Sequence, residues 1–229
     1  MTTKGKLTYA IGDIHGRMDL FELALTRISE HAAKRPHRVI LLGDLVDRGP
    51  DSAGVVATAM DLTDGETFIT LKGNHEDLML RSLRGASTES LSVWLNNGGE
   101  QTLLSYGGPR AVPETHLDWL QALPLTWRDS HRVFVHAGLA PGVPLAMQSE
   151  RAMLWIREVF LAAPAADFPC HVVHGHTPKW SGKPDMAAPE RLAHRTNLDT
   201  GAYATGCLSI GVFDDAVPGG PTKVLTVEA

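Results

Sequence analysis

Cysteine is scarce in this chain of 229 residues, which contains only Cys170 and Cys207. The two thiols lie far apart and form no Cys-x-x-Cys pair, so the sequence predicts neither a disulfide framework nor a zinc knuckle. This use of cysteine fits a reduced, cytoplasmic compartment. No apolar run approaches the roughly 20 residues that cross a bilayer, and no apolar segment with a cleavage site follows Met1. We therefore expect a protein that is neither secreted nor embedded in a membrane.

An excess of positive charge is also missing. The chain has 21 Lys and Arg residues against 26 Asp and Glu residues, a net charge of −5, and its basic residues are scattered. Such a surface does not gather nucleic acid or an anionic membrane, so we expect neither as a partner. The length and the 43% content of hydrophobic residues are typical of one soluble α/β domain, and we assign residues 1–229 to it. The sequence specifies no oligomeric state.

Three apolar runs are each followed by a polar phrase that begins with glycine, and then by a segment with helical periodicity. Phrases about 30 residues apart are typical of repeated βαβ units, and a continuous apolar run is typical of a strand in a parallel sheet. The carboxyl ends of such strands lie at one edge. We therefore expect the side chains of the three phrases to meet there. The runs are 7–11, 39–42 and 67–71, and the phrases are Gly-Asp-Ile-His-Gly (12–16), Gly-Asp-Leu-Val-Asp-Arg-Gly (43–49) and Gly-Asn-His-Glu (73–76).

The remaining chain predicts a further sheet. Residues 85–123 mix apolar residues with glycine and proline, which predicts short helices without a strand; we expect this helical cap to cover the mouth of the site, or else only to complete the core. The simplest architecture is an α/β fold with two mixed sheets. Strands are expected at 132–135, 171–176, 192–198, 207–213 and 223–227, and one amphipathic helix at 152–160.

Six oxygen and nitrogen donors lie at or just past predicted strand ends. This mixture suits Mn²⁺, Fe or Zn²⁺ better than Ca²⁺ or a metal that selects thiolates. One catalytic ion usually takes about three protein ligands, so six donors predict two ions. Two ions together lower the pKa of a shared water and hold a phosphate for in-line attack, and Asp44 is the candidate bridge between them. The donors are Asp13, His15, Asp44, Asn74, His136 and His176.

These phrases, together with His-Ala-Gly-Leu (136–139), Gly-His-Thr-Pro (175–178) and Leu-Asp-Thr-Gly-Ala (198–202), resemble the metal-dependent phosphoprotein phosphatase family, in particular its short bacterial and phage members. The resemblance runs from about Leu7 to Phe213. It implies a calcineurin-like metallophosphoesterase fold, with two mixed β-sheets sandwiched between helices. It also implies a serine/threonine phosphatase that uses two divalent ions, with Mn²⁺ expected first and Fe or Zn²⁺ as alternatives. Its substrates would be phosphoserine and phosphothreonine in proteins, with phosphotyrosine as a further substrate.

The resemblance assigns a role to each site residue. Asp13 and His15 would bind one metal, Asp44 would bridge, and Asn74, His136 and His176 would bind the other. His75 would be the general acid that protonates the leaving oxygen, Asp47 would orient it, and Arg48 and Arg157 would hold the phosphate. The chemistry agrees, because a leaving alkoxide needs a positioned proton donor and a planar guanidinium matches two phosphate oxygens.

Some assignments compete with structural ones. His174 and His176 should face the same side of a strand, so only the match of Gly175-His176-Thr-Pro to the family phrase selects His176. Asp47 could instead start a helix or pair with Arg48, and Arg157 could be a solvated arginine. The histidines without a motif are expected at the surface or in structural roles: His31, His37, His116, His131, His171 and His194.

Three functions compete. The first is a protein phosphatase that attacks the phosphomonoester with a metal-bridging hydroxide. Asp47, Arg48, Glu76 and the phrase Leu-Asp-Thr-Gly (198–201) favour it. The second is a small-molecule phosphoesterase such as a dinucleoside tetraphosphatase, whose members share Gly-Asp-x-His-Gly and Gly-Asn-His. Pro178 stands where nucleases and cyclic-nucleotide esterases carry a histidine, which disfavours those enzymes. The third, a non-catalytic binding protein, would be expected to lack a ligand or the acid, and the chain has them all.

Overall fold

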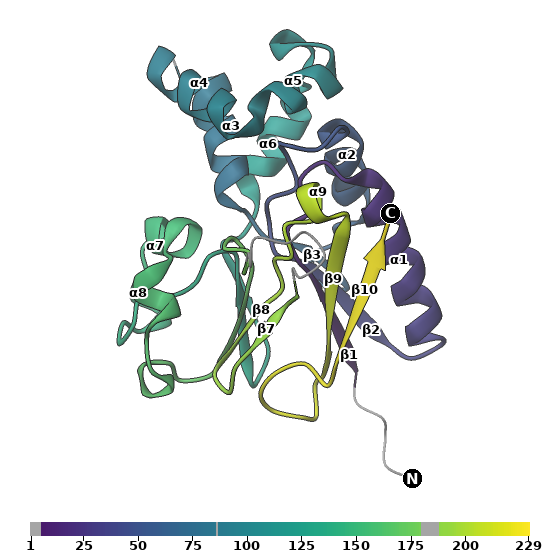
Figure 1. Cartoon of the computed structure of the whole chain (residues 1–229), viewed down its shortest axis with the longest axis vertical. Helices are drawn as coiled ribbons and strands as arrows, with labels where there is room; N and C mark the ends of the chain where they lie inside the picture. Colours follow the sequence, from purple (N-terminus) through teal and green to yellow (C-terminus); the bar gives the residue numbers. More distant parts are fainter. Residues whose placement is uncertain (1–5, 86, 180–187) are drawn as a thin grey trace.

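The computed structural model describes residues 6–85, 87–179 and 188–229. Residues 1–5 and 180–187 of the expected domain, and residue 86 of the helical cap, lie outside this description. Two five-stranded sheets lie between helices (Figure 1). Among the described residues, no helix is both long and apolar enough to span a membrane.

The first sheet has the strand order β10-β9-β1-β2-β3. Its three predicted strands are β1 (Leu7–Ile11), β2 (His37–Leu41) and β3 (Phe68–Thr70), which pair in parallel. The antiparallel strands β9 (Cys207–Asp214) and β10 (Lys223–Glu228) extend the sheet beyond β1. Because β1, β2 and β3 are parallel, their carboxyl ends lie at the same edge, as the sequence predicts.

The second sheet has the order β4-β5-β6-β8-β7 and is also mixed. Its parallel centre consists of β5 (Arg132–Val135), β6 (His171–His174) and β8 (Arg195–Asn197), and its antiparallel edges are β4 (Thr126–Arg128) and β7 (Glu190–Arg191). The sequence did not predict β4, which is short and half-exposed. Of the strand expected at 192–198, only residues 195–197 form a strand, β8, because the chain turns back after β7.

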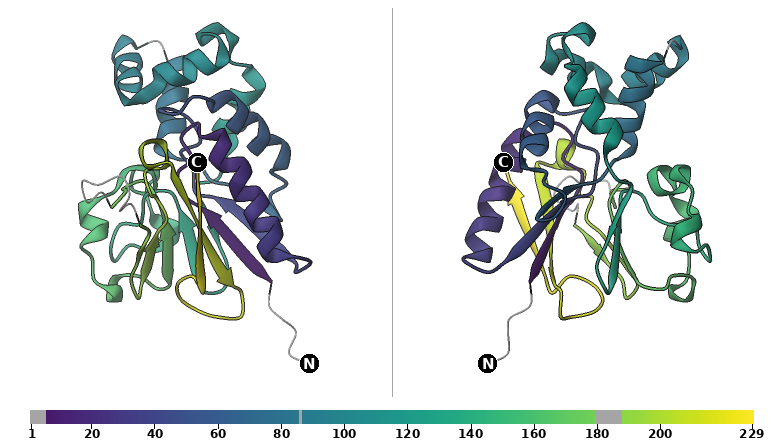
Figure 2. Two further views of the ribbon diagram at one scale, coloured as in Figure 1. Left: turned by 45° about the vertical axis from the view of Figure 1, so that its right-hand side comes forward. Right: turned by 180° about the vertical axis from the view of Figure 1, so that it is seen from behind.

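Helices cover both outer faces and the edge where the parallel strands end (Figures 1 and 2). The helices beside the first sheet are α1 (Met18–Ala32) and α2 (Ser52–Leu62), and α9 (Ala202–Thr205) precedes β9. Beside the second sheet lie η3 (Leu145–Met147), α7 (Glu150–Trp155), α8 (Glu158–Leu161) and η4 (Ala165–Asp167). Above both sheets lie α3 (Asn74–Arg84), α4 (Thr88–Trp94), η1 (Leu95–Gly99), α5 (Glu100–Tyr106), η2 (Pro109–Ala111) and α6 (Glu114–Ala122).

The prediction of a single helix over 152–160 is wrong. The helix α7 ends before Ile156, whose ψ of 140° is extended, and Arg157 has φ −131° and ψ −102°. Neither residue can continue an α-helix. Arg157 therefore lies in the break between α7 and α8, where it remains exposed.

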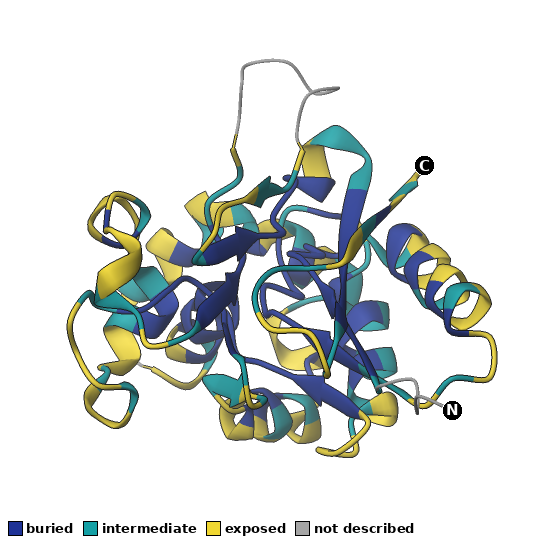
Figure 3. Ribbon diagram, turned by 90° about the horizontal axis from the view of Figure 1, so that it is seen from below, coloured by how far each residue is buried: buried dark blue, intermediate teal, exposed yellow. Residues whose placement is uncertain are grey.

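The core forms three apolar layers around the two sheets. One layer joins the first sheet to α1 and α2, a second lies between the sheets, and a third joins the second sheet to α7 and α8. Figure 3 shows the result, with buried strands in the centre and exposed residues on the outer helices. Within the helical cap, Trp94, Leu117 and Leu120 belong to the first layer. The helical cap therefore contributes to the hydrophobic core, as one of the two expectations states.

Candidate active site

The loops after β1, β2, β3, β5 and β6 meet at the carboxyl ends of the parallel strands, below the helical cap (Figure 1). Backbone hydrogen bonds tie these loops to one another. The backbone N–H of His15 donates to the carbonyl of Asp44 at 2.9 Å, and the N–H of His75 donates to Asp44 Oδ1 at 3.0 Å. The N–H of His176 donates to Asp13 Oδ2 at 3.0 Å. The two sheets thus contribute to one site.

Two glycines allow the loops to approach so closely. A Cβ on Gly12 would lie 2.1 Å from the carbonyl oxygen of Leu198, and a Cβ on Gly43 would lie 2.5 Å from the backbone nitrogen of Gly73. Gly43 also has φ 96°, which glycine adopts without strain. The first residues of the polar phrases are therefore glycine because neighbouring backbone fills the space of a side chain.

Left-handed backbone is concentrated at the site. Six of the described non-glycine residues have a positive φ, and five of them are residues that the sequence singled out. Such conformations cost of order 1 kcal/mol or more each and persist where the surroundings hold them. The five are His15 (47°), Asp44 (52°), Asp47 (74°), Arg48 (70°) and His176 (68°).

Two groups of donor side chains share Asp44. Ligand atoms of His15, Asp44 and His75 lie within 4.8 Å of one another, and so do those of Asp44, His136 and His176. Asp44 Oδ2 lies 3.6 Å from His15 Nε2, and Asp44 Oδ1 lies 3.3 Å from His136 Nε2. All five side chains are buried. One carboxylate therefore faces imidazoles on both sides, which is the arrangement that a bridging ligand requires.

Asn74 and Asp13 are the two remaining predicted donors, and each contacts a histidine of the second group. Asn74 Oδ1 lies 2.8 Å from His136 Nε2. Asp13 belongs to neither group of three, but its Oδ1 is buried and has no hydrogen-bond partner among the described residues. Burial, Asp199 and Asp44 raise the pKa of Asp13 well above its ordinary value. A buried carboxylate oxygen without a hydrogen-bond partner is satisfied by a cation, so these residues fit divalent metal ions.

The charges of the cluster also suit metal binding. Burial raises the pKa of Asp44, but the imidazoles of His136, His75 and His15 outweigh it and hold the pKa below its ordinary value. Burial, and next the neighbouring His136, lowers the pKa of His176 to about 2. Burial also lowers the pKa of His15. An ionised carboxylate between neutral imidazoles is the protonation state in which these side chains bind metals.

His174 faces away from the donor groups. Its ring packs against Phe160 with centroids 4.9 Å apart, and its Nε2 lies 3.4 Å from Arg195 Nη1. The expectation that His174 and His176 face the same side is wrong, because β6 ends at His174 and His176 has left-handed backbone. His176 is the histidine that lies among the donors.

His75 and Asp47 form a buried pair. The Nδ1 atom of His75 lies 2.7 Å from Asp47 Oδ2, and the two side chains are 2% and 0% exposed. Burial lowers the pKa of His75, but Asp44 and Asp47 outweigh this effect and leave the pKa raised. The pair therefore favours a protonated His75, which is the form that a general acid needs.

Both predicted arginines reach the donor groups. Arg48 Nη1 lies 2.8 Å from His15 Nε2, and Arg48 Nη2 lies 2.9 Å from His75 Nε2. Arg157 Nε donates to His176 Nε2 at 3.1 Å. Two guanidinium groups thus lie at opposite ends of the buried cluster, where they add positive charge beside the imidazoles.

Sequence reasoning missed several residues of the site. Tyr203 lies under the Arg48 guanidinium, 4.8 Å from ring centroid to Cζ, and its ring contacts His15. Its place just after Leu-Asp-Thr-Gly-Ala was the available signal. Trp94 and Thr102 both bind Asp47, and no motif marked them. The sequence singles out Glu76 but predicts no contact for it, and its carboxylate accepts the backbone N–H groups of Asp44, Leu45, Val46 and Gly73.

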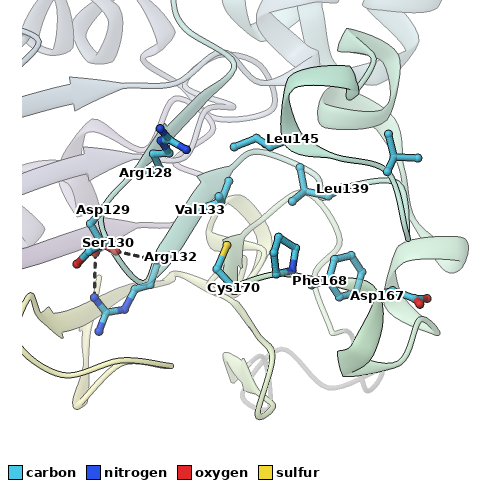
Figure 4. Close-up of a pocket in the computed structure, with 12 residues that line it drawn as sticks. Arg128, Asp129, Ser130, Arg132, Val133, Leu139, Leu145, Asp167, Phe168 and Cys170 are labelled. Carbon is cyan, nitrogen blue, oxygen red and sulfur yellow. Dashed lines mark hydrogen bonds and ion pairs between the residues drawn. The ribbon is translucent and has the colours of Figure 1, made fainter.

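A cavity of about 570 Å³ lies between α3 and α7 and is lined by Arg81, Arg151 and Trp155, among others. The Trp155 ring also contacts His176, with centroids 6.3 Å apart. This cavity therefore adjoins the donor groups. A second cavity, of about 220 Å³, lies beside β4 and β5 near Phe168 and Cys170 (Figure 4), and the residues that line it include none of the predicted site residues.

Comparisons with known proteins agree on the fold. A family model described as calcineurin-like phosphoesterase matches residues 7–203. The symmetrical bis(5'-nucleosyl)-tetraphosphatase of Delftia acidovorans is 31% identical over 216 residues, which cover 90% of this chain and 69% of that protein. A solved structure of a candidate diadenosine tetraphosphatase has a TM-score of 0.71 at 24% identity and covers 100% of this chain and 95% of that one. With the sheet topology, these matches confirm the expected α/β fold.

The comparisons divide on substrate. Serine/threonine-protein phosphatase 1 of Salmonella typhimurium is 30% identical over 215 residues, which cover 88% of this chain and 89% of that protein. This chain spans from half to about two thirds of the length of the tetraphosphatases that it matches. The matches therefore support the broad family and not the narrower phosphoprotein phosphatase branch.

Proposed function

The chain belongs to the calcineurin-like phosphoesterase family, and on that premise we propose that it hydrolyses phosphate compounds with two divalent metal ions held around Asp44. The observation that carries this proposal is the pair of buried donor groups that share Asp44. Asp13 and His15 would hold one ion, and Asn74, His136 and His176 the other. Mn²⁺ comes first for this mixture of donors, with Fe or Zn²⁺ as alternatives. Bound ions supply a water of lowered pKa and offset the charge of the phosphate.

The remaining side chains bind phosphate and move a proton. Arg48 and Arg157 lie beside the two donor groups and offer N–H donors to phosphate oxygens. His75 carries the proton for the leaving group, and Asp47 orients its ring. Arg48 contacts Nε2 of His75. In this contact the guanidinium donates and Nε2 accepts. When the guanidinium turns to a phosphate, it therefore frees Nε2 to take up a proton and face the leaving oxygen.

We propose a dinucleoside tetraphosphate as the first substrate class. The tetraphosphatase of Delftia acidovorans matches 90% of this chain, which supports this choice. The cavity beside Trp155 gives a nucleoside group a place next to the donor groups, and its wall holds an aromatic ring, two arginines and the carboxylates of Asp77 and Glu150. Stacking on a tryptophan and contact with a guanidinium both suit a base and a polyphosphate chain.

Phosphoserine and phosphothreonine in proteins form the second substrate class, and the buried pair of His75 and Asp47 favours it. Symmetrical cleavage of a tetraphosphate expels a nucleoside diphosphate, a stable anion that needs little protonation. Cleavage of a phosphoserine expels an alkoxide, which needs a proton donor. The Salmonella typhimurium phosphatase, which this chain matches over 89% of its length, supports the same class.

One assay separates these proposals. The protein is stripped of metal and supplied with Mn²⁺, then offered diadenosine tetraphosphate, a phosphothreonine peptide and para-nitrophenyl phosphate at equal concentration. We expect turnover that depends on metal and a kcat/KM at least about tenfold higher for the tetraphosphate. Activity that survives exhaustive chelation overturns the two-metal site. If kcat/KM is higher for the phosphothreonine peptide than for diadenosine tetraphosphate, phosphoproteins become the favoured substrate class.

A further inference from the structure

The helical cap is hydrogen-bonded to the carboxylate of Asp47. The indole N–H of Trp94 donates to both oxygens at 3.0 Å, and the Thr102 hydroxyl donates to Oδ1 at 2.7 Å. Asp47, Trp94 and Thr102 are all 0% exposed. These hydrogen bonds are buried, and a hydrogen bond to an ionised carboxylate is about twice as strong as one between neutral groups.

A break in the helical cap brings the two donors together. Trp94 ends α4 and Thr102 lies in α5, and between them Gly98 adopts φ 101°. The carbonyl of Gly98 accepts the backbone N–H of Arg48 at 3.1 Å. A Cβ on Gly98 would lie 2.8 Å from the Arg48 nitrogen, and a Cβ on Gly99 would lie 2.6 Å from the Trp94 ring. The kink therefore fits the helical cap against the backbone that carries Asp47.

Each carboxylate oxygen of Asp47 has a defined set of donors. Oδ2 accepts from Trp94 and lies 2.7 Å from His75 Nδ1, while Oδ1 accepts from Trp94 and Thr102. The backbone N–H of Asp47 donates to Thr102 Oγ1 at 2.9 Å and to Ser52 Oγ at 3.0 Å. Three side-chain donors around one carboxylate leave it a single orientation. The partner of a catalytic histidine sets the direction of its ring in the same way.

We propose that Trp94 and Thr102 are positioning residues, which fix the Asp47 carboxylate and through it aim the His75 ring at the leaving group. The inference rests on the phosphoester hydrolysis proposed above and adds a role for the helical cap. The helical cap orients the proton donor through hydrogen bonds to Asp47, in addition to any role in covering the mouth of the site. Neither residue touches substrate in this role.

The test compares leaving groups, because a misplaced acid slows the poorer leaving group more. The variants Thr102→Val, which keeps the shape and removes the hydroxyl, and Thr102→Ser, which keeps the hydroxyl, are assayed with Mn²⁺ on phenyl phosphate and para-nitrophenyl phosphate. We expect Thr102→Val to lower kcat for phenyl phosphate about tenfold more than for para-nitrophenyl phosphate, with KM and metal content unchanged. Thr102→Ser should restore the ratio.

Two further variants keep the test decisive. Trp94→Phe removes the indole donor and should change the same ratio even if Thr102→Val folds poorly. Ser105→Ala removes a hydroxyl of the helical cap that contacts the backbone of Ala53 and the carbonyl of Thr102 but not Asp47, and it should leave the ratio unchanged because the Thr102 hydroxyl stays in place. If Thr102→Val and Trp94→Phe lower kcat equally on both esters, the positioning role is overturned and the proposed hydrolysis of phosphate esters stands. A metal-loaded parent protein that hydrolyses neither ester overturns phosphomonoester hydrolysis itself, and the inference with it.

Discussion

The Nδ1 atom of His75 lies 2.7 Å from the carboxylate of Asp47, and the pair is sealed from solvent. We predict that His75→Asn slows hydrolysis of a phosphothreonine peptide by roughly 10²- to 10⁴-fold, the usual contribution of a general acid. Para-nitrophenyl phosphate should lose less, and diadenosine tetraphosphate least, because their leaving anions are more stable. Steady-state kcat on the three substrates measures this order.

Metal analysis is the control for His75→Asn. Asparagine keeps a polar side chain of similar size, so metal content should equal that of the parent protein. Equal losses of kcat on all three substrates would contradict the acid role and leave His75 as a donor to the metal site, where the geometry of His15, Asp44 and His75 also places it.

Asp44 is the side chain that both donor groups share, so its loss should affect both ions. We predict that Asp44→Asn lowers metal affinity and turnover by at least about 100-fold, the upper range found even for residues that only support a ligand. Metal titration and kcat/KM with added Mn²⁺ measure the change. The control is Asp61→Asn at the exposed end of α2. Loss of one ion with the other held at full affinity would argue against a bridge.

Gly98 and Gly107 form a matched pair within the helical cap, since both have a positive φ, 101° and 79°. A Cβ on Gly107 meets nothing within 4 Å, whereas one on Gly98 meets the Arg48 backbone at 2.8 Å. Gly107→Ala should cost only the conformational strain, about 1 kcal/mol. Gly98→Ala should cost at least about 2 kcal/mol and lower kcat as well. Urea unfolding of both variants measures the difference, and equal free energies of unfolding would contradict the contact.

His171 should make stability depend on pH. Burial lowers its pKa below the ordinary 6.5, and its Nε2 lies 2.9 Å from Thr196 Oγ1. Below pH 6.5 the unfolded chain binds a proton at His171 more readily than the folded chain does. The neutral, buried His171 therefore contributes its full stability above pH 6.5, and this contribution is lost as pH falls below 6.5. We predict that His171→Gln unfolds in urea with a shallower dependence on pH from 7.5 to about 5. Identical slopes, measured with chelator present, would contradict the shift.

Much of the site could be predicted from sequence because its residues follow strands of one parallel sheet. Strand ends place Asp13, Asp44 and Asn74 at one edge by topology alone. The same rule failed at His174 and His176, because it assumes a strand that continues, and β6 ends at His174. The apolar periodicity predicted one helix through Arg157. Periodicity reports which residues are apolar and does not reveal a break in the backbone, such as the one at Ile156 and Arg157.

Contacts between distant segments were beyond prediction from local pattern. Trp94 and Thr102 reach Asp47 only because α4 and α5 diverge at Gly98, and that geometry depends on the Arg48 backbone against which Gly98 packs. The edge strand β4 was missed for a related reason. Its middle residue, Trp127, packs against Phe134 of β5. Three residues are too few to show an alternating pattern, so only the pairing with β5 identifies β4 as a strand.

The left-handed backbone at His15, Asp44, Asp47, Arg48 and His176 has a consequence for anyone who evolves this protein for heat resistance. Glycine at each of these positions would relieve roughly 1 kcal/mol of strain. It would also delete a donor, the partner of the acid or an arginine. At Asp47 the buried donors of Trp94 and Thr102 would lose their acceptor, and this loss outweighs the relieved strain. At the other positions a library screened for survival at high temperature alone would favour inactive variants wherever the relieved strain exceeds the lost contacts, so such a screen needs turnover as a second criterion.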